Sequence, residues 1–379
     1  MNAKYYQTSQ DGEEVGELIF LPDEGEENEV INLYPTITYQ TFEGFGGAIT
    51  EAAAYVYQQM NETDKKGLMQ RYFSKEHMKY QMVRISIDSC DFSLGHYEAL
   101  SEDPKGDWSN FDFSRVEQYI LPMLEDAQKA YGGKLSIMLT PWSPPAFMKS
   151  NQERNHGGIL MEQYYPLWAE YICHYIKEFT RRGYEVKRLS IQNEPKAVQA
   201  WDSCIFTAKE EALFLRDYLA PAMKRHALSF VEVFIWDHNK ERILERAMES
   251  IGPDTKDLIQ GVAFHWYSGD HFEALGMLRE CFPDKKMILS EACIEYCKYS
   301  KEEAGNHVTK YAHDIIGNFN QGMCAFYDWN LLLNEESGPN HVGNFCEAPF
   351  LYDTKQKKLL EQKTANCLWH FSHFIEAGD

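Results

Sequence analysis

The chain has 379 residues, of which 44% are hydrophobic and 14% aromatic, and its formal net charge is −21. So many aromatic residues exclude an intrinsically disordered chain and provide material for one large core. The acidic balance argues against nucleic acids and anionic membranes as partners, because clustered lysine and arginine bind phosphate, and it favours a neutral or cationic ligand.

The chain opens with a polar, acidic stretch, MNAKYYQTSQDGEEVG, which lacks the basic and apolar segments of a secretion signal. No apolar run approaches the roughly 20 residues that cross a bilayer. Nine cysteines, an odd number, are scattered through the predicted core elements, as is typical of reduced thiols in a cytoplasmic protein. We therefore expect a cytoplasmic protein without a membrane span. Secretion stays open, because a removed signal peptide would leave no trace.

A small β-sheet region is predicted over residues 1–40. The stretches ELIFLP (17–22) and NEVINLYPTITYQTF (28–42) have the composition of β-hairpin strands. We expect them to form a side sheet that packs beside the main domain.

From residue 42 onwards, eight short apolar runs alternate with helical patterns. Their continuous apolar character is typical of parallel strands that are covered on both faces. Eight such β–α units predict a (β/α)₈ barrel over residues 41–370, with an open doubly wound sheet as the alternative. The predicted strands are 42–50, 82–91, 135–142, 188–195, 231–238, 261–267, 286–293 and 323–330.

Three of the intervening segments have clear helix signals. Residues 113–133 end on Gly-Gly and contain a proline that would kink the helix, and residues 161–183 end on basic residues and glycine. Residues 207–227 begin with a threonine cap and an acidic first turn. These helices would cover the outside of the barrel.

Polar and aromatic side chains follow the predicted strands. In such a barrel the functional groups lie at the C-terminal ends of the strands. Glu194 ends the fourth predicted strand and Glu291 the seventh, on opposite sides of the barrel mouth. Tryptophans beside carboxylates and amides suit a sugar, which has apolar C–H faces and a rim of hydroxyls.

Two facing carboxylates are the arrangement of a retaining glycosidase. One donates a proton to the leaving oxygen while the other attacks the anomeric carbon, and water then releases the sugar. The alternative from the pattern alone is a pair of structural glutamates in salt bridges.

At this point the sequence resembles glycoside hydrolase family 30, in the branch that contains glucosylceramidase and microbial β-glucosidases and β-1,6-glucanases. Eight motifs carry the resemblance in the family's order, from FEGFGGAITEAA (42–53) to HFSHFI (370–375). The motifs between them are SCDFS, TPWSPPAFMK, QNEP, GVAFHWY, LSEAC and DWNLLLNEESGPN.

The resemblance implies roles for ten residues. Glu194 in QNEP matches the acid/base, Glu291 in LSEAC matches the nucleophile, and Asn193 matches the amide that binds the sugar 2-hydroxyl. The positions that match groups holding the glucose ring are Asp91, Trp142, Trp329 and Asn340. His265 and Tyr267 match groups near the nucleophile, and Arg84 matches an arginine that keeps the nucleophile ionised.

The surroundings of these residues lead to further expectations. An arginine beside Glu291 would lower its pKa, whereas burial would raise that of Glu194. Arg84 lies inside a strand, where an unpaired charge would be costly, so we expect it to have a carboxylate partner. The alternative to a role beside Glu291 is that Arg84 forms a structural ion pair elsewhere. For His265 the alternative is a core histidine, and for the two tryptophans plain core packing. Three more residues at strand ends would order loops: Asp88, Asp237 and His238.

No cofactor or metal is predicted. The sequence GFGG has its third glycine misplaced for a dinucleotide fingerprint. Glu291, Cys293, Glu295 and Cys297 do not have the spacing of a zinc site, and no His-Cys cluster accompanies them.

The sequence therefore predicts a retaining β-glycosidase that cleaves terminal β-glucosyl units or a β-1,6-glucan. A β-xylosidase or β-fucosidase of the same family, a transglycosidase and a non-catalytic carbohydrate-binding barrel are the alternatives. The predicted ligand is the carbohydrate substrate.

The resemblance also raises an expectation about the side domain. In the family a further set of strands follows the last motif and completes a β-sandwich, and here residues 371–379 would be the start of that segment. We expect the side sheet to be incomplete. An uncovered sheet edge favours pairing with a second copy, which would give a homo-oligomer.

Overall fold

The computed structural model describes residues 3–9, 12–18, 34 and 36–379, which fall into two compact units, Met1–Gln40 and Thr41–Asp379. In the first unit, β1 (Ala3–Ser9) pairs antiparallel with β2 (Gly12–Leu18). Most of the predicted strand 17–22 lies outside the described residues. The described part of 28–42 forms no strand, contrary to prediction, and its apolar residues Ile37 and Tyr39 are 52% and 80% exposed, so they do not form a buried strand face.

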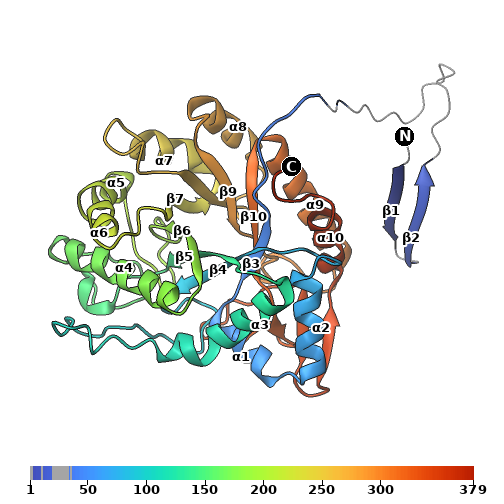
Figure 1. Cartoon of the computed structure of the whole chain (residues 1–379), viewed down its shortest axis with the longest axis horizontal. Coiled ribbons are helices and arrows are strands. Elements are labelled where there is room, and N and C mark those ends of the chain that lie inside the picture. Colours follow the sequence, from blue (N-terminus) through green and yellow to red (C-terminus); the bar gives the residue numbers. More distant parts are fainter. Residues whose placement is uncertain (1–2, 10–11, 19–33, 35) are drawn as a thin grey trace. The chain divides into compact units, whose positions relative to one another are not determined.

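Eight parallel strands of the second unit close into a barrel, and helices surround it (Figure 1). The barrel prediction is confirmed. Seven of the predicted strands contain most or all of one observed strand, and the predicted strand 188–195 contains only the second half, 188–190, of the strand Glu185–Ser190. In chain order the strands are β3 (Phe45–Ala48), β4 (Met82–Ile87), β5 (Ser136–Pro141), β6 (Glu185–Ser190), β7 (Glu232–Asn239), β8 (Gly261–His265), β9 (Lys286–Glu291) and β10 (Met323–Asn330). Closure is by pairing of β10 with β3.

The ten α-helices of the described residues lie in the second unit. They are α1 (Glu51–Gln59), α2 (Glu62–Phe73), α3 (Leu121–Tyr131), α4 (Tyr165–Arg181), α5 (Ala208–Phe214), α6 (Ala220–Arg225), α7 (Ile243–Ser250), α8 (Phe272–Cys281), α9 (Ala304–Asn320) and α10 (Lys363–Ser372). The predicted threonine cap is present, because Thr207 forms a reciprocal capping box with Glu210.

Two of the predicted helices contain a turn of π-helix just before a proline. The π turns Val116–Ile120 and Leu215–Leu219 end two residues before Pro122 and Pro221. A proline has no N–H to donate and its ring clashes with the carbonyl four residues earlier, so a wider turn at that point relieves both problems. The kink predicted from the proline in 113–133 is therefore observed as a local widening of the helix into a π-helical turn.

A three-stranded sheet between β10 and α10 was not predicted. It consists of β11 (Leu333–Asn334), β12 (Phe350–Asp353) and β13 (Lys358–Glu361). The last residues of the chain return to the start of the barrel unit, where the Phe42 N–H donates to the Asp379 carbonyl at 2.9 Å. The continuation of 371–379 into a side domain stays a prediction.

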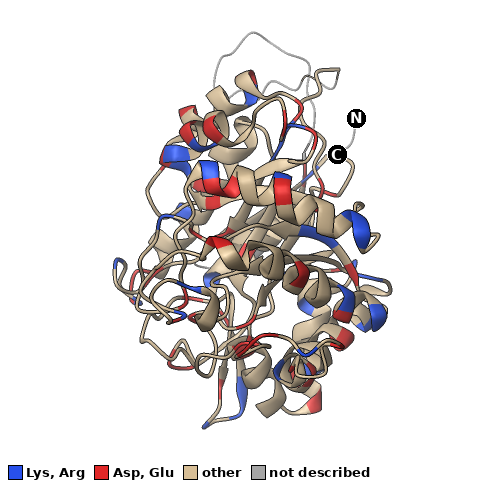
Figure 2. Cartoon of the chain, turned by 90° about the vertical axis from the view of Figure 1, so that its left-hand side faces the viewer, with Lys and Arg blue, Asp and Glu red and all other residues tan. Residues whose placement is uncertain are grey.

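Burial is concentrated between the strands and the helices. A second, smaller cluster fills the barrel interior and includes Met82, Met138 and Phe234. Seven of the nine free cysteines are buried, and Cys281 and Cys297 are exposed. Acidic and basic residues are interspersed over the helices in Figure 2. Across the described ranges, no helix has the length and apolarity needed to cross a bilayer.

Candidate active site

The backbone at the C-terminal end of the barrel is held in unusual conformations. Glu194, four residues beyond β6, has φ +45°, and the consecutive residues Trp236 and Asp237 have φ +74° and +50°. Left-handed backbone at residues other than glycine costs about 1–3 kcal/mol and is concentrated at functional sites. The Glu194 N–H donates to the Asp237 carbonyl at 2.9 Å, which fixes the two strained segments against each other.

A cavity opens among these strand ends. Its walls contain carboxylates, amides and aromatic rings: Asp91, Phe92, Trp142, Asn193, Glu194, Gln199, Trp201, His238, Asn239, Tyr267, Glu291, Cys293, Glu295, Lys298, Trp329, Asn344 and Cys346. Seven of the ten residues singled out from the sequence therefore share one cavity. Of the remaining three described residues, Arg84 and His265 lie fully buried beneath it and Asn340 lies behind Asn344.

Glu291 is held by two donors. Arg84 Nη1 donates to Glu291 Oε2 at 2.6 Å, and the Tyr267 hydroxyl donates to Oε1 at 3.0 Å. Arg84 itself is completely buried and its second Nη donates to Asn193 Oδ1 at 2.9 Å and to Asp237 Oδ2 at 3.0 Å. The carboxylate partner expected for Arg84 is thus present as Glu291, and Asp237 is a second one.

Glu194 is held by histidines instead. Its Oε1 lies 3.2 Å from His265 Nδ1 and 3.6 Å from His238 Nδ1. The other ring nitrogen of His265 lies 3.1 Å from Asp237 Oδ1. A protonated His265 donates to both carboxylates at once, so Asp237 connects the surroundings of Glu194 to Arg84 and through it to Glu291.

These contacts give the two glutamates different pKa values. Burial raises the pKa of Glu291 above its ordinary value, against the positive charges of His265 and Arg84, and the charge of Glu194 adds to the rise. Burial also acts to raise the pKa of Glu194, but the hydrogen bond from His265 and the charges of His238 and His265 outweigh it and lower the pKa. Both expected directions are therefore reversed, because burial outweighs Arg84 at Glu291 and the histidines outweigh burial at Glu194.

His265 should make folding stability depend on pH. Despite its burial, the charge of Glu291 and the hydrogen bonds to Asp237 and Glu194 raise its pKa to about 9. Between the ordinary value of about 6.5 and 9, the folded protein keeps a proton that the unfolded chain has lost, so stability should fall as pH rises through this window, by on the order of 3 kcal/mol.

Urea unfolding at pH 6, 7.5 and 9 measures this effect. The wild type should lose stability across the series, and His265→Gln should show a clearly flatter slope even if it is less stable throughout. Equal slopes for the two proteins would show that His265 is not protonated in the folded state.

Two tryptophans form one wall of the cavity. The rings of Trp142 and Trp329 are stacked with centroids 5.3 Å apart, and the guanidinium carbon of Arg84 lies 4.8 Å from the Trp142 centroid. Phe92 meets Trp329 edge to face at 6.1 Å. The rings are 2% and 3% exposed, but both border the cavity, which is the position needed to contact the C–H face of a sugar.

Asp91 faces the loop that carries Asn340, the asparagine singled out from the sequence. Asn344 Nδ2 donates to Asp91 Oδ2 at 3.2 Å and lines the cavity, whereas Asn340 closes the loop by accepting from the Asn344 and Val342 amides at 3.1 and 3.0 Å. Burial and the charge of Glu291 raise the pKa of Asp91 well above its ordinary value. Trp201 and Asn344 also line the cavity but were not singled out from the sequence, because they lie on loops with no strand pattern; for Asn344 the second asparagine of GPNHVGN was the available signal. Asn239, which ends β7, lies one residue beyond the predicted strand 231–238.

The fold and the cavity together define a carbohydrate-active enzyme of the (β/α)₈ type. The family model described as "Glycosyl hydrolase family 30 TIM-barrel domain" matches residues 42–375. The chain therefore belongs to glycoside hydrolase family 30, and it is a glycoside hydrolase.

Relatives in this family share most of the chain. It is 28% identical over 367 residues to the lysosomal acid glucosylceramidase of Mus musculus, and the matched region covers 92% of this chain and 71% of the relative. An endo-1,6-beta-D-glucanase of Trichoderma harzianum is 23% identical over 324 residues, with 81% and 64% covered. Among solved structures, SrfJ from Salmonella typhimurium is 37% identical with a TM-score of 0.95, covering 100% of this chain and 85% of SrfJ.

Proposed function

We propose that the enzyme hydrolyses terminal β-glucosidic bonds by double displacement, with Glu291 as the nucleophile and Glu194 as the acid/base. The observation that carries the proposal is that the two glutamates, from the ends of β6 and β9, line one cavity with the tryptophan wall and Asn193. Relatives named as glucosylceramidases and as endo-1,6-β-glucanases support a β-glucosyl substrate.

The surroundings of each glutamate fit its proposed role. Arg84 and Tyr267 hold both oxygens of Glu291, so its attacking oxygen is fixed in direction. Asn193 precedes Glu194 and has its side-chain oxygen on Arg84, which leaves its amide N–H groups to donate to a sugar hydroxyl. Asp91 faces the same cavity and is suited to bind further hydroxyls.

Substrate binding would set the protonation state that the reaction needs. Because each carboxylate disfavours ionisation of the other, the pair readily shares one proton between them. A glycosidic oxygen beside Glu194 accepts a hydrogen bond only from its protonated form, and positive charge developing at the anomeric carbon favours an ionised Glu291. The substrate therefore moves the proton from the Glu291 side to Glu194.

A panel of nitrophenyl glycosides, followed by a 2-deoxy-2-fluoroglucosyl inactivator, tests the proposal. We expect the β-glucoside to be the best substrate of the panel and mass spectrometry to find the label on the peptide that contains Glu291. A preference for β-xyloside or β-fucoside would contradict the proposed sugar specificity but would leave the proposed mechanism unaffected. A label on any other residue would contradict the assignment of the nucleophile.

A further inference from the structure

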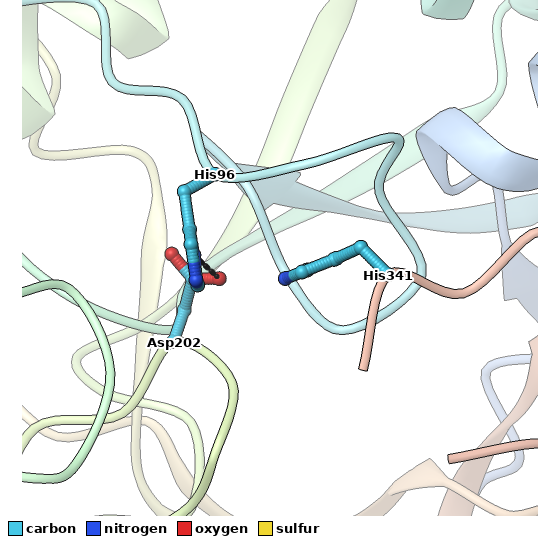
Figure 3. Close-up of side chains that lie close together, drawn as sticks. All are labelled: His96, Asp202 and His341. Atoms are coloured by element: carbon cyan, nitrogen blue, oxygen red, sulfur yellow. Dashed lines mark hydrogen bonds and ion pairs between the residues drawn. The ribbon is translucent and has the colours of Figure 1, made fainter. Parts of the chain in front are cut away.

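Two histidines and an aspartate from three separate loops meet beside the candidate active site. His96 follows β4, Asp202 follows β6 and His341 follows β10, and Figure 3 shows the three side chains converging on one point. One ligand atom from each lies within 4.8 Å of the other two. The imidazole rings have centroids 4.7 Å apart, and His96 Nδ1 lies 3.0 Å from Asp202 Oδ2.

His341 offers a free lone pair to the centre of this cluster. Its Nδ1 lies 3.1 Å from the carbonyl oxygen of Ser93, which can only accept, so Nδ1 carries the hydrogen and Nε2 does not. Nε2 is buried and has no hydrogen-bond partner among the described residues. An imidazole oriented by a carbonyl, with the opposite nitrogen unoccupied, is the usual state of a metal ligand.

Asp202 contributes a negative charge. Its Oδ1 accepts from Arg154 Nε at 2.5 Å and from the Ser89 hydroxyl at 2.8 Å, so only Oδ2 faces His96. Oδ2 is therefore the carboxylate oxygen that Asp202 offers to a cation in this cluster.

The positive charge of Arg154 is itself opposed by other carboxylates. Arg154 Nη1 lies 3.5 Å from Asp88 and 3.6 Å from Glu98, both of which are in the loop that carries His96. The guanidinium thus contacts three carboxylates, and it holds Asp202 by Oδ1, whereas His96 contacts Oδ2.

We propose that His96, Asp202 and His341 bind a divalent transition metal ion, with zinc the best match. Two imidazole nitrogens and one carboxylate oxygen suit zinc and its neighbours, whereas calcium and magnesium require oxygen ligands. The ligand atoms of a tetrahedral zinc lie roughly 3.4 Å from one another. The exposed ring of His96, with 39% of its side chain accessible, can turn to close the cluster to that size.

The site would connect loops that shape the cavity without lying in it. Asp202 is next to Trp201, and His341 is three residues from Asn344, both of which line the cavity. A metal ion bound by all three loops would restrain them relative to one another. The proposal concerns metal binding and loop stability, so it does not depend on which sugar the enzyme cleaves.

Calorimetric titration of the chelator-treated full chain with zinc chloride tests this site. The wild type should bind one zinc ion per chain, and zinc should raise its Tm. His96→Gln and His341→Gln should each weaken binding at least tenfold and remove the rise in Tm. His156→Gln is the matched control, because this exposed histidine also pairs with one carboxylate, that of Glu153 at 3.1 Å, and it should bind zinc as the wild type does.

Cobalt(II) in place of zinc identifies the ligand atoms. Weak visible bands without a thiolate charge-transfer band are expected, and they should be lost in His96→Gln. If His341→Gln fails to fold, His96→Gln alone decides, since 39% of the His96 side chain is accessible and its replacement disturbs the core less. Absent zinc binding, equal affinity in wild type and His96→Gln, or a thiolate band from the exposed Cys281 or Cys297 would each overturn the proposal.

Discussion

Replacing Glu291 with glutamine is expected to lower kcat/KM on a nitrophenyl β-glucoside by a factor on the order of 10⁴ or more. The substitution removes the oxygen that forms the covalent intermediate, and loss of a nucleophile is among the most damaging single changes in an enzyme. It also leaves Arg84 without one of its two carboxylate partners. Initial rates measured at several pH values check the result.

Glu295→Gln provides the matched control for this loss. Glu295 borders the same cavity four residues further on, but it pairs with Lys298 at 2.7 Å rather than with Arg84. Its replacement should change kcat/KM less than tenfold. Comparable losses in both variants would mean that the cavity depends on its overall charge and not on a nucleophile at Glu291.

Replacing Glu194 with alanine is expected to lower activity by an amount that depends on the leaving group. General acid catalysis contributes about 10²–10⁴-fold, and it matters most when the departing oxygen is basic. A β-glucoside with an unactivated alcohol should therefore be hydrolysed 10²–10⁴-fold more slowly. A dinitrophenyl glucoside should still form the covalent intermediate, because its leaving group needs no proton.

Azide distinguishes an acid/base role from a structural one. With Glu194 absent, a small anion can enter the space left by its carboxylate and attack the intermediate, so azide should restore turnover of the dinitrophenyl glucoside. The product should be a β-glucosyl azide, with the configuration of the substrate retained. An α-glucosyl azide, or equal losses for all leaving groups, would contradict the proposed role.

Much of the barrel could be predicted because its signals are local. A buried parallel strand must be apolar along its whole length, and eight such runs separated by helical patterns are visible in the chain. The ends of those runs then mark where polar groups face the mouth, which is how Glu194 and Glu291 could be found 97 positions apart before any coordinates were known. The sheet β11–β13 lacked this local signal, whereas segment 36–42 has the composition of a strand but forms none.

By itself, the sequence determined the strands, their order along the chain and the residue types at their ends, since apolar period and strand length are properties of neighbouring residues. Only the tertiary structure decided which side chains surround each carboxylate. His265 lowers the pKa of Glu194 because Asp237 holds the His265 ring beside that carboxylate, and the three residues come from different strands or strand ends. In the same way His96, Asp202 and His341 come together only through barrel closure, since charge and proximity act through space and not along the chain.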